Sequence, residues 1–262
     1  GAPRQGVRRG RRDQAAGIPP VLWRMRRTAL VTGGGRGIGR AVVSALARDA
    51  WVAALDLAFP DGPGDASLAA LADVRDAASV GRAVQQVVGE RQGIDWVVCA
   101  AGIVRDHVSW KMSADAWAEV IAVNLTGGFV TARAASAALR SSGSGRLVFI
   151  GSVNGLRGRF GQANYAASKA GLVGLARTLA RELSSDGVTV NVVAPGFVDT
   201  AMTRTLPDEG RARAIARTPM RRPGRPEEIA AAVRFLCGDD AGFITGAVLP
   251  IDGGQLLGVD GP

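Results

Sequence analysis

The chain of 262 residues is 47% hydrophobic and 21% charged, a balance that is typical of a globular protein and excludes an intrinsically disordered one. No apolar run approaches the roughly 20 residues of a membrane-spanning helix, so we expect no membrane association. Cys99 and Cys237 lie far apart in apolar stretches without metal-ligand spacing, which favours a reduced cytoplasmic protein with no metal site.

The formal net charge of +9 is concentrated in residues 1–27, which contain eight arginines against one acid, Asp13. Glycine, proline and arginine dominate this segment, and it has neither a secretory h-region nor an apolar periodicity before Val21. We therefore interpret residues 1–27 as a basic disordered extension and residues 28–262 as one domain. An arginine-rich arm can bind nucleic acid or acidic lipid, but a disordered extension explains this composition better, and we expect no nucleic-acid partner.

Short β-branched or apolar runs alternate with helical stretches from Thr28 onward, a pattern that is typical of a parallel sheet with helices on both faces. The predicted strands span residues 29–32, 51–55, 68–71, 96–99, 146–150, 189–193 and 247–250. The predicted helices begin near residues 37, 76, 114, 162 and 226. We expect an α/β fold, a single-domain Rossmann-type doubly wound parallel sheet, with its ligand crevice at the carboxyl ends of the strands.

A glycine-rich turn joins the first predicted strand to the first helix. Its residues are Thr32, Gly33, Gly34, Gly35, Arg36, Gly37, Ile38 and Gly39. Such a turn lets backbone amides and a helix N-terminus approach a pyrophosphate without interference from side chains. In a chain with 36 glycines the loop alone is weak evidence, but its position between a strand and a helix favours a dinucleotide site.

Asp56 ends the second predicted strand, about 20 residues after the turn, where an acid can accept hydrogen bonds from both ribose hydroxyls and repels a 2′-phosphate. It therefore favours NAD(H). Arg36 indicates the opposite, because a guanidinium beside the ribose can pair with the phosphate of NADP(H). We give Asp56 more weight and keep NADP(H) as an alternative. Asp73 and Val74, after the third strand, are placed to contact the adenine.

Tyr165 and Lys169 lie four residues apart on a predicted helix and so share one face. Tyr165 is the only tyrosine, and Lys169 is one of two lysines among 32 basic residues, so a lysine stands here in a chain that otherwise uses arginine. A free phenol has a pKa of about 10, so proton exchange near neutral pH needs a neighbouring cation, which Lys169 supplies.

Two further polar residues complete the predicted catalytic set. Ser152 lies just after the end of the fifth predicted strand, and its hydroxyl is placed to hold a substrate oxygen. Asn124 is expected to bind a water that links Lys169 to solvent. Singly these residues are common in turns, but with Tyr165 they indicate hydride transfer between a cofactor and a carbonyl or secondary alcohol. A hydrolase would have to use His107, the only histidine, and no G-x-S-x-G motif supports that alternative.

From about residue 28 to residue 254 the chain resembles the short-chain dehydrogenase/reductase family. The turn from Thr32 to Gly39 is similar to the family's T-G-x-x-x-G-x-G motif, and its catalytic tetrad is matched by Asn124, Ser152, Tyr165 and Lys169. The resemblance implies that Tyr165 and Lys169 also contact the cofactor and that Asp73 contacts the adenine. Further implied cofactor contacts are Ala100, Ala101 and Gly102 after the fourth strand, and Pro195, Gly196, Val198 and Thr200 after the sixth.

Within the family, segments 151–153, 162–169 and 191–197 are most similar to 3-oxoacyl-[acyl-carrier-protein] reductases, which implies an acyl carbonyl substrate. Asp56 differs from NADPH-using members, and Gly143 and Asp186 stand where many members carry basic residues for carrier-protein docking. A polyketide or small-molecule ketoreductase, an NAD-dependent secondary alcohol dehydrogenase and a non-catalytic dinucleotide-sensing protein therefore stay open as alternatives.

The arginine-rich segment 196–226 resembles the family's mobile lid over the substrate. One interpretation is that its arginines attract an acidic substrate or a phosphopantetheine arm. The other interpretation is that they form a solvated helix surface. The resemblance also implies a homodimer or homotetramer, in which residues 114–139 and 162–183 pair between subunits.

Overall fold

Seven parallel strands form the sheet in the part of the chain that the structure describes. The computed structural model describes residues 26–258, so the predicted extension lies outside the described residues except at its last two positions. The strands are β1 (Arg27–Thr32), β2 (Ala50–Asp56), β3 (Leu68–Leu71), β4 (Trp96–Cys99), β5 (Arg146–Ile150), β6 (Thr189–Pro195) and β7 (Val248–Ile251). They pair in the order β3-β2-β1-β4-β5-β6-β7. The predicted doubly wound α/β sheet is confirmed.

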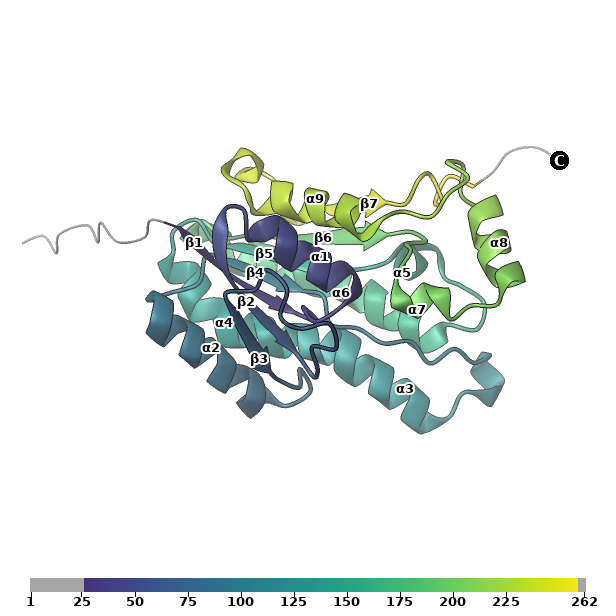
Figure 1. The fold of residues 1–262 in the computed structure, drawn as a ribbon, viewed down its shortest axis with the longest axis horizontal. Coiled ribbons are helices and arrows are strands. Elements are labelled where there is room, and N and C mark those ends of the chain that lie inside the picture. Colours follow the sequence, from purple (N-terminus) through teal and green to yellow (C-terminus); the bar gives the residue numbers. More distant parts are fainter. Residues whose placement is uncertain (1–25, 259–262) are drawn as a thin grey trace, which may run out of the picture.

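Helices cover both faces of the sheet, because successive residues of each strand point to opposite sides. Leu30 of β1 belongs to a core that also contains residues of α2 (Ala77–Arg91), α4 (Gly127–Ser141) and α6 (Ala163–Leu183). Its neighbours Ala29 and Val31 belong to a second core, with α1 (Gly37–Leu46) and α9 (Pro226–Cys237). In Figure 1, α1 and α9 lie above the sheet, and α2 and α4 lie below it.

Side chains that accept hydrogen bonds from first-turn amides begin several helices, among them α2 and α3. Asp76 accepts from the Ala78 N–H (2.8 Å) at the start of α2, and Ser113 accepts from the Ala116 N–H (3.1 Å) at the start of α3 (Ala114–Ile121). Each such cap is worth about 1 kcal/mol of helix stability. The local sequence therefore fixes where these helices begin.

The helix α3 continues through a π turn, Ala122–Thr126, into α4, which makes Ala114–Ser141 one helical stretch of 28 residues. By length and composition alone this stretch is apolar enough to cross a membrane, which the sequence analysis did not anticipate. Within the fold, α4 packs against α2 and α3 packs against α6. That arrangement is typical of a core helix in a sheet-and-helix domain.

The structure differs from the predicted elements in two respects. Arg27 already belongs to β1, where its guanidinium donates to Ser144 Oγ (2.6 Å) and Asp239 Oδ1 (3.1 Å). The strand therefore begins two residues before the predicted strand 29–32 and one residue before the predicted domain boundary at residue 28. Three short helices were not predicted, because segments of four to nine residues carry too little apolar periodicity. They are α5 (Val153–Arg157), α7 (Ala201–Arg204) and α8 (Asp208–Ala216).

Candidate active site

A cavity of about 620 Å³ opens at the carboxyl ends of the strands, beside the point where the strand order reverses between β1 and β4. Most of the predicted site residues line it: Gly33, Arg36, Gly37, Ile38, Gly39, Asp56, Asp73, Val74, Ala100, Ala101, Gly102, Ser152, Tyr165, Lys169, Pro195, Gly196, Val198 and Thr200. The cavity lining does not include Thr32, Gly35 or Asn124. Sequence reasoning missed several lining residues, among them Leu57, Arg75, Ile103, Met202 and Thr203.

The glycine-rich turn is shaped so that other backbone segments, and a ligand, can approach it closely. Gly33 has a φ of +70°, and a Cβ there would lie 2.6 Å from the Ala101 nitrogen, so no other residue fits. A Cβ on Gly39 would collide with the Gly33 carbonyl oxygen. The N-cap of α1, Arg36, makes no side-chain hydrogen bond to the first turn. The close backbone approach at the turn and the uncapped start of α1 therefore fit a pyrophosphate.

Asp56 and Arg36, which gave opposite indications of the cofactor, lie together at one end of the cavity. Asp56 is nearly buried and accepts hydrogen bonds from the Gly35 N–H (2.9 Å) and the Leu57 N–H (2.7 Å). The guanidinium of Arg36 is 60% exposed and lies 4.0 Å from the Asp56 carboxylate. The acid is thus fixed in place by the backbone, whereas the arginine is free to move and already faces a negative charge.

Asp73 lines the cavity, but its carboxylate is engaged by a residue that the sequence did not single out. Arg75 donates to it from Nη2 (2.6 Å), from Nε (3.0 Å) and from the backbone N–H (2.9 Å). These hydrogen bonds hold the pKa of Asp73 below its usual value. The adenine contact of Asp73 stays a prediction, and it would involve an ionised carboxylate that is shared with Arg75.

Tyr165 and Lys169 face each other across one turn of α6, as their spacing predicts. The Lys169 ammonium lies 5.6 Å from the Tyr165 ring centroid and donates to the Ile150 carbonyl oxygen (2.9 Å) at the end of β5. Burial lowers the pKa of Lys169 to about 8. Burial also raises the pKa of Tyr165, although a hydrogen bond with Ser152 acts in the opposite direction. In this structure desolvation thus outweighs the expected acidification of the phenol.

Ser152 is the N-cap of α5, two residues after β5 ends at Ile150, so it lies at the carboxyl end of that strand. Its hydroxyl is within reach of Tyr165 and accepts a hydrogen bond from the Asn154 N–H (3.1 Å). The start of α5 thus places the Ser152 hydroxyl beside the Tyr165 hydroxyl.

Asn124 lies in the π turn between α3 and α4, and its amide braces the loop after β4. It accepts from the Ile103 N–H (2.8 Å) and donates to the Ile103 oxygen (3.0 Å) and to Ser168 Oγ (3.1 Å). A π turn is frequently found at functional sites because it displaces one residue from the regular helical face. The water that we expected between Asn124 and Lys169 stays a prediction.

A chain of buried amides surrounds the two hydroxyls, and sequence reasoning missed it. Arg157 donates to Asn154 Oδ1 (3.4 Å), Asn154 donates to Gln162 Oε1 (3.0 Å), and Gln162 donates to both oxygens of Asp106 (3.0 and 2.9 Å). The only signal in the sequence is that Asn154 and Gln162 lie within three residues of Ser152 and Tyr165. The chain ties the loop after β4 to both catalytic segments.

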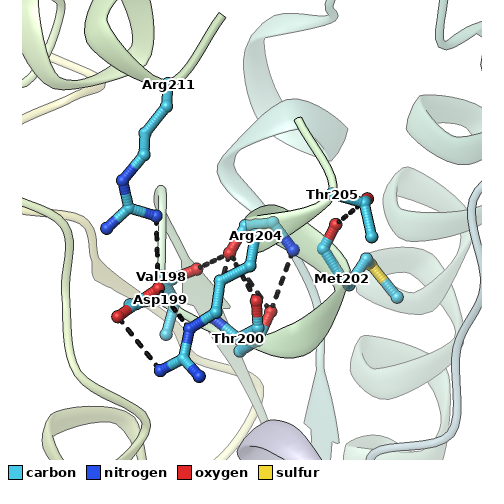
Figure 2. Close-up of polar contacts among 8 residues, drawn as sticks. Val198, Asp199, Thr200, Met202, Arg204, Thr205 and Arg211 are labelled. Carbon is cyan, nitrogen blue, oxygen red and sulfur yellow. Dashed lines mark hydrogen bonds and ion pairs between the residues drawn. The ribbon is translucent and has the colours of Figure 1, made fainter. Parts of the chain in front are cut away.

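The predicted lid is anchored to the end of β6 through Asp199. Figure 2 shows that Arg204 of α7 and Arg211 of α8 both reach this carboxylate, at 3.1 and 3.2 Å. Thr200 caps α7 reciprocally with Thr203. The two ion pairs hold the pKa of Asp199 below its usual value. Since α7 lines the cavity, these contacts position one of its walls.

Comparison with known proteins gives the same assignment as the geometry. A family model described as enoyl-(acyl carrier protein) reductase matches residues 33–255. The chain belongs to the short-chain dehydrogenase/reductase family. It is therefore an NAD(P)-dependent oxidoreductase that acts on hydroxyl or keto groups, and the predicted reaction class is confirmed.

Individual relatives cover most of the chain. It is 43% identical to the 3-oxoacyl-[acyl-carrier-protein] reductase MabA of Mycobacterium avium, over 88% of this chain and 91% of the relative. It is also 43% identical to the 3-oxoacyl-[acyl-carrier-protein] reductase FabG of Escherichia coli, over 87% of this chain and 97% of the relative. The crystal structure of gox2181 superimposes with a TM-score of 0.83 at 34% identity, covering 88% of this chain and 96% of that one.

Proposed function

We propose that this oxidoreductase reduces 3-oxoacyl thioesters to 3-hydroxyacyl thioesters, with Tyr165 as the proton donor. One observation carries the proposal. Ser152, Tyr165 and Lys169 line the same cavity as the glycine-rich turn. The names of the curated relatives supply the acyl substrate. Reversal of the same steps gives oxidation of the alcohol.

Nicotinamide, when bound, supplies the hydride for the substrate carbon. The Ser152 hydroxyl holds the substrate oxygen in place, and the Tyr165 phenol gives that oxygen its proton as the alcohol forms. Lys169 then stabilises the phenolate that remains. The amides of the glycine-rich turn, at the start of α1, bind the pyrophosphate.

The cofactor end of the site favours NADH over NADPH. Asp56 is held by two backbone amides, so it cannot withdraw from a 2′-phosphate, and the charge of Arg36 is already partly offset by Asp56 at 4.0 Å. The repulsion between the Asp56 carboxylate and a 2′-phosphate in a partly buried site is stronger than the attraction that the exposed Arg36 side chain supplies. NADPH use would require Arg36 to turn toward the phosphate.

The test is a substrate assay that follows nicotinamide absorbance with NADH and with NADPH. The substrates are a 3-oxobutyryl thioester, a trans-2-enoyl thioester and a neutral small ketone. We expect the oxo thioester with NADH to give the highest kcat/KM. Preference for the enoyl thioester would assign the reaction named by the family model, and preference for the small ketone would assign a small-molecule ketoreductase; either result contradicts the proposal.

The proposed working form is a cytoplasmic homodimer or homotetramer. Outward positions of α6 carry small residues, Ala163, Ala167, Ala170 and Gly174, which permit close approach of a second helix. Trp117 and Phe129, on α3 and α4, are both more than 40% exposed. Cys99 and Cys237 are buried and unpaired, which fits a reducing compartment.

A further inference from the structure

Three arginines, two of them in the loop before Tyr165 and one in the lid, lack the ion pairs that most arginines of the lid form. In the lid, Arg204 and Arg211 pair with Asp199, Arg213 pairs with Glu209, and Arg222 and Arg225 pair with Glu228. Within residues 26–258, no carboxylate forms an ion pair with Arg157, Arg159 or Arg217. We call these three residues the arginine cluster. Like Arg221, whose guanidinium donates to the Ala216 carbonyl oxygen, they are positive charges of this region that a ligand can still neutralise.

Backbone contacts place two members of the arginine cluster, Arg157 and Arg217, near the same C-terminal loop. Arg157, at the end of α5, donates to the Gln255 carbonyl oxygen (3.1 Å). Arg217 ends α8, and the next residues turn back onto the same C-terminal loop, where the Met220 N–H donates to the Gly253 oxygen (3.1 Å). Arg159 follows two residues after Arg157, in the loop that leads to Tyr165. Arg157 and Arg217 thus lie near the same C-terminal loop, and Arg159 lies between Arg157 and Tyr165 in the sequence.

Electrostatic effects agree with this placement. Burial, together with the positive charges of Arg159 and Arg217, lowers the pKa of Arg157, and Asp252 opposes the change. Asp252 is itself engaged, because its carboxylate accepts from the Gly254 and Leu256 amides. Burial raises the pKa of Tyr165, and the positive charge of Arg159 is one of the influences that oppose this rise. Three positive charges with one nearby carboxylate leave a net positive charge, which attracts an anion.

An exposed aromatic pair adjoins the cluster. Phe160, next to Arg159, is 84% exposed and meets Trp110, which is 74% exposed, edge to face at 6.4 Å between ring centroids. Exposed aromatic side chains held in one geometry commonly mark a binding surface. A ligand that contacts both features has an apolar or amide-bearing part and a negative charge.

We propose that Arg157, Arg159 and Arg217 form an anion subsite that binds the phosphate of a phosphopantetheine-linked 3-oxoacyl thioester, while the Trp110–Phe160 pair contacts the pantetheine arm. The inference rests on the proposed function, of which it specifies the substrate class. It also explains how this chain selects a carried substrate although Gly143 and Asp186 replace basic residues expected for carrier docking. The phosphate is common to a carrier protein and to coenzyme A.

The experiment compares one acyl group on three carriers. The 3-oxobutyryl thioesters of a phosphopantetheinylated carrier protein, of coenzyme A and of neutral N-acetylcysteamine are reduced by the wild type and by the double variant Arg159→Gln/Arg217→Gln. We expect the ratio of kcat/KM for each phosphate-bearing substrate to kcat/KM for the neutral one to fall roughly 10-fold or more in the variant. The loss should shrink as salt is added. Arg157 is left intact because its hydrogen bonds also support α5.

The matched control is Arg213→Gln, which removes an exposed lid arginine that already has Glu209 as a partner. We expect its ratios to equal those of the wild type. An equal loss for all three thioesters would overturn the subsite, since the arginines would then act on the chemistry. A loss with coenzyme A alone would also overturn it, because it would implicate phosphates that the carrier protein lacks.

Failure of the proposed function has a different signature, namely a wild type that reduces none of the three thioesters. The subsite is then tested by calorimetric titration with 4′-phosphopantetheine. Binding by the wild type that weakens roughly 10-fold in the double variant supports the subsite, and absence of binding overturns it.

Discussion

At the scale of single residues, the reaction depends on one phenol and the groups around it. Replacing Tyr165 with phenylalanine removes the proton donor while keeping the ring that packs beside Lys169. General acid catalysis typically contributes about 10²–10⁴-fold, so we expect kcat to fall by that factor. Cofactor affinity, measured by fluorescence titration, should change little. Normal turnover in this variant would remove Tyr165 from the mechanism.

Lys169 makes the reaction sensitive to pH in a defined window. Burial lowers its pKa to about 8, so the ammonium loses its proton as the pH rises through 8 rather than near its usual value. The positive charge that stabilises the phenolate is therefore lost above pH 8, and reductive turnover should fall there. The pH profile of kcat/KM for the cofactor reports groups of the unliganded enzyme and checks this. A profile that stays flat up to pH 10 would contradict the prediction.

Asp56 is the residue on which the cofactor preference depends. Asp56→Ala removes the charge that repels a 2′-phosphate and frees Arg36 from its nearest acid. We expect the ratio of kcat/KM for NADH to that for NADPH to fall roughly 10-fold. Arg36→Gln should change the ratio in the opposite direction. An unchanged ratio in Asp56→Ala would mean that another residue determines the preference.

At the scale of elements, the lid depends on a single carboxylate shared by two helices. Asp199→Asn removes both ion pairs, with Arg204 of α7 and Arg211 of α8. Each pair is partly exposed and worth at most about 1 kcal/mol, so global stability should change little. We expect faster amide hydrogen exchange across residues 200–217 and a KM raised several-fold, because the lid then closes less often.

The control for the lid is Glu209→Gln, which breaks only the exposed pair with Arg213 on α8. Its hydrogen exchange and KM should match those of the wild type. If both variants changed KM equally, the effect would come from surface charge in general and Asp199 would have no special role in closure.

At the scale of the whole molecule, the outward face of α6 should pair two subunits. Gly174 lies on this exposed face, and a Cβ there would meet nothing within 4 Å, so Gly174→Glu leaves the subunit itself undisturbed. A charged side chain between two closely packed helices is costly, and we expect a smaller assembly by sedimentation equilibrium. Gly89→Glu, an equally open and exposed position on α2, is the control and should keep the wild-type mass.

The sequence by itself determined the fold class, the glycine-rich turn and the Tyr165–Lys169 pair. The reason is that these features depend on local patterns: strand and helix periodicity, backbone freedom at glycine and a spacing of four residues on a helix. The same locality explains why α5, α7 and α8 were missed, since short segments carry little periodic signal.

Only the tertiary structure decided what surrounds these residues. Desolvation, which sets the direction of the Tyr165 and Lys169 pKa shifts, depends on every element packed around the cavity. The pairing of Arg75 with Asp73 and the amide chain from Arg157 to Asp106 depend on side-chain geometry and, for the amide chain, on segments far apart in the sequence. The arginine cluster emerged for the same reason, because which arginines lack a carboxylate partner is a property of contacts and not of composition.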